Sequence, residues 1–279
     1  MSSIDQQLDR KIEQIRLANE RRTKNTNALA DPLRELTANS VTKSNALSRA
    51  YYRFGLVEKR CMEALISKLN PMRGDNPQEI ELLATEYAKA FPDVGKHAYE
   101  HLARAGDMLV NKIITIESPR AGVLRDKIPL MLIVSYQPKA GKIVCEFNPK
   151  ILPHLLGLRG RFSSYPLREA VNFTSSYTWR FYELLVSWAQ DKKNTNDLLV
   201  GWIDRQSVEE LREMMGVPAS YNWGMFKKKV LSVVEAELRK KANIHITFKE
   251  VKTSRKITHL NIKFIEDGQQ QLSLGGSGN

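Results

Sequence analysis

Basic residues gathered near the carboxyl-terminal end are the side chains of this sequence best suited to chemistry. Residues 221–256 contain ten Lys or Arg and three Glu, and their net charge of +7 is more than half of the +12 carried by all 279 residues. Lysine and arginine neutralise phosphates and release the counterions that condense on a nucleic acid. The concentration of charge therefore favours a polyanionic partner. The positions of the cations along the predicted elements indicate what kind of polyanion it is.

A helix is predicted over residues 221–242, where apolar residues recur at helical spacing. Its inward face is expected to consist of Trp223, Phe226, Val230, Val233 and Val234. The opposite face and its flanks carry the residues expected to contact DNA: Tyr221, Asn222, Met225, Lys227, Lys228, Lys229 and Ser232. For a lone run of three lysines, a solvated helix surface would be the simpler interpretation.

Two strands are predicted after this helix, over residues 244–248 and 257–264, and the turn between them is basic. The turn contributes three further candidate DNA contacts, Lys252, Arg255 and Lys256. A helix-turn-helix followed by a hairpin is the winged-helix plan, in which a helix enters the major groove and the hairpin lies along the adjacent backbone. The basic turn is what makes DNA contact the better interpretation of the lysine run.

A second basic cluster lies near the middle of the chain. It consists of Arg159, Arg161 and Arg168, with Tyr165 among them. A segment that joins two DNA-binding domains can cross the minor groove and hold phosphates. An exposed linker with no DNA contact is the alternative.

The sequence carries no pattern that predicts catalysis or a bound cofactor. It lacks the Gly-x-x-x-x-Gly-Lys-Ser/Thr loop of phosphate-binding ATPases. His97 and His101 share a helix face but have no third ligand, so we expect no metal site. Cys61 and Cys145 lie among apolar neighbours and are expected to be buried free thiols. We therefore expect a protein that is not an enzyme and needs no cofactor.

The elements that position these residues follow the same order in both halves of the chain. In the first half we predict helices over 57–69, 78–90 and 94–111, then strands over 113–117, 128–136 and 142–147. In the second half we predict helices over 177–188, 207–215 and 221–242, with a strand over 198–203 and the final hairpin. Helix, helix, helix and hairpin thus occur twice. The prediction is an α+β fold of two tandem winged-helix domains in a pseudo-two-fold arrangement.

The predicted domain limits are residues 44–155 for the first winged-helix domain and residues 156–266 for the second. Residues 1–43 are expected to hold an amphipathic helix over 4–22 and a polar linker, and residues 267–279 a flexible tail. The helix over 4–22 is either a weakly packed surface helix or a self-association arm. The longest wholly apolar run, residues 130–134, is far short of the roughly 20 residues that cross a bilayer. The first residues are polar rather than a signal peptide, so we expect a cytoplasmic protein.

Three stretches of the sequence carry specific motifs. They are residues 44–60, beginning Ser-Asn-Ala-Leu, residues 162–185, with Tyr-Thr-Trp-Arg-Phe-Tyr-Glu-Leu-Leu at 177–185, and residues 208–231, with Phe-Lys-Lys-Lys-Val-Leu at 226–231. In these motifs the sequence resembles the theta-type plasmid replication initiators, which bind repeated sites called iterons. The resemblance covers about residues 44–265.

The resemblance implies a bacterial, cytoplasmic protein whose monomers bind iterons in double-stranded origin DNA, one winged-helix domain in each of two successive major grooves. It also implies that the monomers help open the origin and recruit the host initiator ATPase and replicative helicase. The resemblance further implies that homodimers form through the first domain and repress the initiator's own promoter. Val134 and Ile143, in the predicted hairpin of the first domain, are candidates for the dimer interface, with core packing as the alternative for each.

Two other functions are alternatives to replication initiation. A motif in the tail also indicates a sliding clamp as a partner. A winged-helix transcription regulator without a replication role would also bind DNA, and tests on origin DNA would separate the two. A nickase or relaxase would show metal-dependent strand cleavage, but no His-x-His motif accompanies the tyrosines. Gln271-Leu272-Ser273-Leu274 resembles the bacterial sliding-clamp-binding motif, although Gly275 stands where that motif has Phe.

Overall fold

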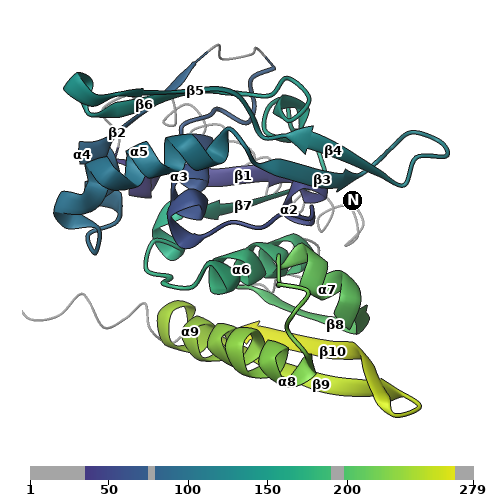
Figure 1. The fold of residues 1–279 in the computed structure, drawn as a ribbon. Coiled ribbons are helices and arrows are strands. Elements are labelled where there is room, and N and C mark those ends of the chain that lie inside the picture. The colour runs from purple at the N-terminus through teal and green to yellow at the C-terminus, as the bar shows by residue number, and fades with distance from the viewer. Residues whose placement is uncertain (1–34, 75–78, 190–197, 268–279) are drawn as a thin grey trace, which may run out of the picture.

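The computed structural model describes residues 35–74, 79–189 and 198–267 (Figure 1). The predicted helix over residues 4–22 and the tail motif Gln271 to Leu274 lie outside the described residues. Within the described ranges, no helix is both long enough and apolar enough to span a membrane.

The amino-terminal part of the described chain mixes short sheets with three main helices. Its elements are β1 (Ser40–Ser44), α2 (Asn45–Ser48), α3 (Leu56–Ser67), β2 (Ile80–Leu83), α4 (Ala84–Ala90), α5 (Ala98–Leu109), β3 (Ile113–Glu117), β4 (Arg125–Pro129), β5 (Met131–Gln137), β6 (Lys142–Phe147) and β7 (Phe162–Pro166). Strands β2, β6 and β5 form an antiparallel sheet in that order, β3 pairs with β4, and β1 pairs with β7. Helix α5 packs against β5 and β6.

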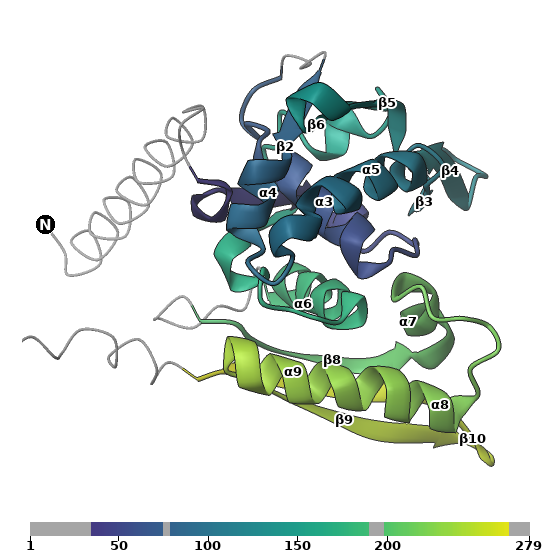
Figure 2. The same ribbon diagram turned by 60° about the vertical axis from the view of Figure 1, so that its left-hand side comes forward.

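The carboxyl-terminal part is a helical layer on one three-stranded sheet. Its elements are α6 (Ser176–Ala189), β8 (Val200–Ser207), α7 (Val208–Met214), α8 (Trp223–Phe226), a π-helical turn (Lys227–Leu231), α9 (Ser232–Ala242), β9 (Ile244–Thr253) and β10 (Lys256–Glu266). The sheet order is β8, β10, β9, and both pairings are antiparallel. Both views show α6 between the amino-terminal part and α9 (Figures 1 and 2).

Helix α6 is buried on almost every side because it lies between the two parts. Trp179, Phe181, Leu184 and Leu185 have no exposed surface, and Tyr177 and Trp188 are half-buried against the core. A helix that is apolar around most of its circumference is stable only when it is surrounded. The prediction of a helix here is confirmed, and the helix forms the centre of the molecule.

Two of the predicted elements of the amino-terminal part are wrong. The segment predicted as one helix over residues 78–90 is strand β2 followed by helix α4. Ile80 and Leu82 point into the core while Glu81 and Leu83 are exposed, because β2 pairs with β6. The strand predicted over residues 128–136 is two strands, because Leu130 leaves the ladder and its amide donates to the Lys112 carbonyl at 2.8 Å.

The polar segment before the first domain also differs from its prediction. The sequence predicts a polar linker between the helix over residues 4–22 and residue 44, but β1 pairs with β7 over five residues and buries Val41 and Lys43. The side chain of Ser44 caps α2 by accepting from the Leu47 amide at 3.1 Å. The pairing of β1 with β7 crosses the predicted domain boundary after residue 155, and that boundary stays a prediction.

Cys61 and Cys145 are buried and free, as predicted. Burial raises the pKa of both thiols. Ile143 is fully buried, and half-buried Val134 packs against the core within reach of Gly106. The structure therefore gives both residues the core role that was the alternative to a dimer interface. On strand β5 of the same sheet, Leu132 and Ile133 are exposed, at 51% and 52%.

Candidate nucleic-acid interface

Helix α7, a turn and the helix that begins at Trp223 form the predicted helix-turn-helix. The Ser207 hydroxyl accepts from the Glu210 amide, which begins α7, and Gly216 ends the segment with a φ of +63°. The Asn222 side chain accepts from the Met225 amide at 2.9 Å and so caps α8. Asn222, a predicted DNA contact, therefore has a structural role at the start of the helix.

The helix from Trp223 to Ala242 is interrupted by the π-helical turn, which changes which residues face inward. Phe226, Val230 and Val234 are fully buried, as predicted. Val233 is 38% exposed, so its assignment to the core is wrong, and Leu231 is buried instead, at 3%. A π-turn holds one extra residue, and the residues after it are displaced around the helix axis.

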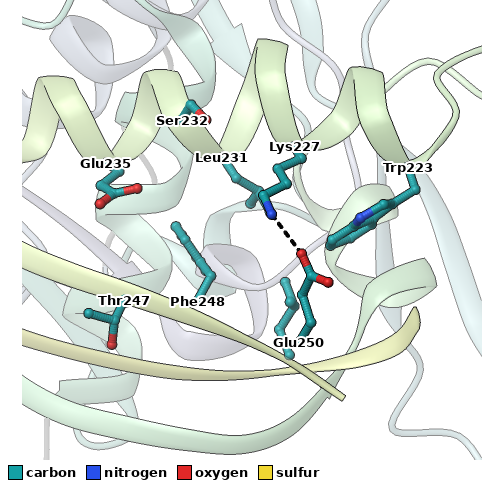
Figure 3. Close-up of a pocket in the computed structure, with 9 residues that line it drawn as sticks. Trp223, Lys227, Leu231, Ser232, Glu235, Thr247, Phe248 and Glu250 are labelled. Atoms are coloured by element: carbon teal, nitrogen blue, oxygen red, sulfur yellow. Dashed lines mark hydrogen bonds and ion pairs between the residues drawn. The ribbon is translucent and has the colours of Figure 1, made fainter. Parts of the chain in front are cut away.

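The three consecutive lysines of this helix have different surroundings. The Lys227 ammonium donates to the Glu250 carboxylate on β9 at 2.8 Å and joins the helix to the hairpin (Figure 3). The Lys229 ammonium lies 5.3 Å from the centre of the Tyr221 ring. Lys228 is exposed, and within the described ranges it makes no hydrogen bond or ion pair. Of the three, Lys228 is the one most available to a ligand.

A small cavity of about 270 Å³ lies between this helix and β9 (Figure 3). Its lining includes Trp223, Ser232 and Phe248. Ser232 thus lines the space toward the hairpin, whereas Tyr221 and Met225 are half-buried. Of the seven DNA contacts predicted on this helix, Asn222, Lys227, Lys228, Lys229 and Ser232 are exposed.

The hairpin of β9 and β10 presents its cations at its tip. Lys252, Arg255 and Lys256 are all exposed, and Ser254, with a φ of +56°, makes the turn between the strands. In both ribbon views this tip projects beyond the end of α8 (Figures 1 and 2). We call Lys228 together with Lys252, Arg255 and Lys256 the basic surface. It combines one helix face with one hairpin tip, as winged-helix contact with DNA requires.

The middle basic cluster is divided in the structure. Arg159 and Arg161 line a groove of about 870 Å³ that also includes Arg49, Gln206 and Glu210, and so runs between the two parts of the molecule. Arg161 has a φ of +50°, a conformation that bulky side chains rarely adopt, and its carbonyl accepts from the Asn45 amide at 2.7 Å. Exposed Arg168 lies outside the groove lining, and Tyr165 is buried in the core.

The hairpin of β3 and β4 is a basic element that the sequence analysis missed. Arg125 donates to Glu213 of α7 at 2.9 Å, and its guanidinium stacks on the Tyr51 ring at 3.9 Å. Arg120 at the hairpin loop pairs with Asp126. Pro119 and Gly122, which separate two apolar segments, were the available signal for a turn here.

Three cations counted in the net charge are enclosed between the two parts. Lys43, Lys59 and Arg180, with the carboxylates of Glu63 and Glu183, form what we call the buried charge cluster, and none is more than 3% exposed. Lys59 lies 2.6 Å from both carboxylates, Lys43 pairs with both, and Arg180 lies 3.2 Å from Glu183.

Burial alone would raise the pKa of the Glu183 carboxyl. The adjacent charges of Lys43, Lys59 and Arg180 outweigh burial and hold that pKa well below its ordinary value. Glu183 is therefore ionised, and the cations of the cluster are engaged with carboxylates rather than with solvent.

The histidine pair does not converge on a metal-ligand set. His97 lies 3.1 Å from Glu100, and burial and the nearby Arg60 charge lower the pKa of His101. Across the described ranges, no group of three or more His, Cys, Asp or Glu side chains is placed to hold a metal ion.

Both parts of the chain match known families of replication proteins. Residues 40–186 match the family described as "Initiator Replication protein, WH1", and residues 207–264 match "Initiator Rep protein, WH2". The fold is similar to that in the crystal structure of Pi initiator protein in complex with iteron DNA, with a TM-score of 0.66 and 21% identity, over 85% of this chain and all of that chain.

A second solved structure also matches part of the chain. It is the WH1 domain of MSBI1.176, a replication protein isolated from a multiple sclerosis patient, with a TM-score of 0.27 and 18% identity over 39% of this chain and 78% of that one. The two family matches and the Pi likeness confirm the prediction of two tandem winged-helix domains in an α+β fold.

Proposed function

The chain belongs to the initiator replication protein family, and from that premise we propose that it is a plasmid replication initiator that binds iterons in double-stranded origin DNA. The Pi protein, whose fold it shares, was crystallised with iteron DNA. The protein acts by binding, in the bacterial cytoplasm, and not by catalysing a reaction.

The basic surface is the observation that carries this proposal. Lys228 projects from a capped and packed helix, and Lys252, Arg255 and Lys256 project from the adjoining hairpin. A helix placed in the major groove exposes its outward side chains to base edges, while a hairpin tip meets phosphates. The ion pair of Lys227 with Glu250 links the helix to the hairpin at the surface.

The groove between the two parts supports contact along a longer stretch of duplex. Arg159 and Arg161 are exposed on its lining, where they would bind phosphates between the regions held by the two winged-helix domains. Phosphate contacts fix the position and register of a protein on DNA, while base contacts select the sequence.

Selection from a pool of random duplexes tests DNA recognition directly. We expect the protein to enrich one sequence covering about two helical turns, without nucleotide, and with affinity that falls with salt by a log–log slope of about −0.9 per phosphate neutralised. Failure to enrich any sequence, or an absolute requirement for ATP, would overturn the proposal.

Opening the origin needs an energy source from elsewhere, since the sequence contains no phosphate-binding ATPase loop. We therefore propose that the host initiator ATPase and replicative helicase act on the complex, with the sliding clamp as a further partner through Gln271 to Leu274. Helicase loading on origin plasmid should depend on this protein and on the host ATPase together. Loading without this protein would contradict the proposal.

Self-association follows from symmetry. A two-fold dimer presents two identical DNA-binding surfaces in opposite orientations, which suits an inverted repeat, such as an operator at its own promoter, and not a direct repeat. We propose that dimers bind inverted repeats and monomers bind direct repeats. Sedimentation of the free protein and of each complex tests this, and a stable dimer on one direct-repeat unit would contradict it.

A further inference from the structure

The end of α7 is held from inside the molecule by the side chain of Arg180. Its Nε donates to the Met214 carbonyl, the last residue of α7, at 2.8 Å. Met214 directly precedes the turn of the helix-turn-helix. The position of that turn, and of the helix that follows it, is therefore tied to α6.

The same guanidinium also holds the amino-terminal part. Its two Nη atoms donate to the backbone carbonyls of Ser48 and Ala50, at 2.6 and 2.5 Å. Every side-chain nitrogen of Arg180 donates a hydrogen bond, the side chain is buried, and its Cζ lies 4.3 Å from the centre of the Tyr52 ring. A planar guanidinium can join three carbonyls in fixed directions, which a lysine ammonium on a flexible stem cannot reproduce.

Gly216, in the turn itself, lies directly against the backbone of the amino-terminal part. A Cβ at this position would lie 2.6 Å from the Tyr52 carbonyl oxygen and 2.9 Å from the Arg53 Cα. The backbone of Gly216 also has a φ of +63°, which favours glycine. Any larger residue must push the turn away from Tyr52.

A third contact that holds the end of α7 lies at the surface. The Arg125 guanidinium of β4 donates to Glu213, the residue before Met214, at 2.9 Å. The end of α7 is therefore held from the core by Arg180, from the β3–β4 hairpin by Arg125 and by direct backbone contact at Gly216.

We propose that Arg180 and Gly216 are positioning residues that set the separation and rotation between the two winged-helix domains, and thereby the spacing of the two halves of the DNA site. The inference rests on the proposed function, because it requires both domains to contact one duplex. One inserted base pair moves the second half-site by about 3.4 Å and about 35° around the helix axis. A rigid pair of domains cannot follow that change, whereas a loosened pair can.

The test uses the full chain and the duplex obtained by selection, with one or two base pairs inserted or removed between its two protected blocks. For the unaltered protein we expect each single change to weaken binding at least tenfold. For Gly216→Ala and Arg180→Lys we expect weaker binding at the original spacing, and a spacing penalty that falls below threefold or an optimum that moves by one base pair.

The control is Gly74→Ala, because a Cβ there meets no atom within 4 Å and its φ is not positive. It should retain the full spacing penalty. Arg125→Ala, which removes a half-exposed side chain, keeps the test decisive if Arg180→Lys does not fold, and should reduce the penalty two- to threefold. Circular dichroism identifies folded variants.

The outcomes separate the two ideas. If selection yields no site, the proposed function fails. If a site is obtained and the folded variants keep the unaltered spacing penalty, the positioning role is overturned while DNA recognition stands. Equal weakening at every spacing would likewise show that these residues affect stability alone.

Discussion

The buried charge cluster and the basic surface use the same side chains in opposite surroundings. In the cluster, Lys59 lies 2.6 Å from two carboxylates and is almost wholly enclosed. On the basic surface, Lys228 and the hairpin cations are exposed to solvent. Low-dielectric surroundings strengthen the first set of interactions and protect them from salt, whereas salt screens the second.

The difference shows that a net charge is a poor measure of a DNA-binding surface. Lys43, Lys59 and Arg180 contribute to the formal +12, yet all three are buried inside the protein and paired with carboxylates there. Their effect is on how the two parts are held together. Binding depends on the smaller number of cations that the fold leaves at the surface.

The largest expected effect is on stability, from removing one charge of the cluster. Glu183→Gln leaves Lys43, Lys59 and Arg180 with too little negative charge, and breaking a buried pair in this way costs roughly 3–5 kcal/mol. Urea unfolding measures the loss. The matched change at the exposed helix–hairpin pair, Glu250→Gln, should cost no more than about 1 kcal/mol. Equal losses of unfolding free energy in Glu183→Gln and Glu250→Gln would show that the buried and exposed ion pairs stabilise the protein alike.

A smaller effect, on binding rather than stability, is expected from Lys228→Ala. If Lys228 contacts a base, affinity for the selected duplex should fall by about 1–3 kcal/mol, with the loss concentrated at one base pair. Titration against duplexes with single base changes locates that position. Lys263→Ala is the control, because Lys263 is exposed on β10 opposite Thr247 and lies well away from the hairpin tip. The same loss of affinity for both variants would show that the helix carrying Lys228 does not contact DNA.

Acid should weaken the buried charge cluster. The pKa of Glu183 is depressed in the folded protein, so its stabilisation is complete above about pH 4.5 and is lost as the pH falls below that value. One such carboxyl changes the unfolding free energy by at most about 1.4 kcal/mol per pH unit. Unfolding free energies measured from pH 3 to 6 should show a flatter profile for Glu183→Gln. If Glu183→Gln leaves the pH dependence of the unfolding free energy unchanged, the depressed pKa of Glu183 is contradicted.

The smallest effect is expected at the hairpin tip. Lys256→Ala should lower the magnitude of the log–log salt slope of binding by about 0.9 and leave stability within about 0.5 kcal/mol. Binding measured over a range of salt concentrations gives the slope. Glu183→Gln should leave the salt slope of binding unaltered. A slope that changes in Glu183→Gln but not in Lys256→Ala would show that the buried charge cluster, and not the hairpin tip, contacts the phosphates.

Elements with strong local signals could be predicted from the sequence. Ser207 and Gly216 mark the ends of α7, and the apolar spacing from Phe181 to Trp188 predicts α6. Strand β1 could not be predicted, because its residues are mostly polar and its partner β7 lies more than a hundred residues away. Strand β2 is only four residues long, and its apolar spacing also fits a helix.

The candidate DNA-binding site could likewise be predicted only where the local sequence carries the signal. The exposed cations of the hairpin follow from a basic turn between two strands, and the structure places them at the tip. The sequence could not show that Lys227 pairs with Glu250 on another element, or that the π-turn exchanges Leu231 for Val233 in the core. Nor could it distinguish Lys43 from a surface lysine, because Glu183 is 140 residues further along.

The cluster also decides where this chain can be divided or exchanged. It draws on β1, α3 and α6, so a fragment cut between β7 and α6 would leave Lys43, Lys59 and Glu63 without Glu183. Residues 207–264 contribute no side chain to it, and Arg180 reaches only the backbone of Met214 there. A chimera that takes this segment from a relative would keep the cluster whole while replacing the recognition helix and hairpin. The same arrangement lets evolution change which DNA is bound without rebuilding the core that holds the two domains.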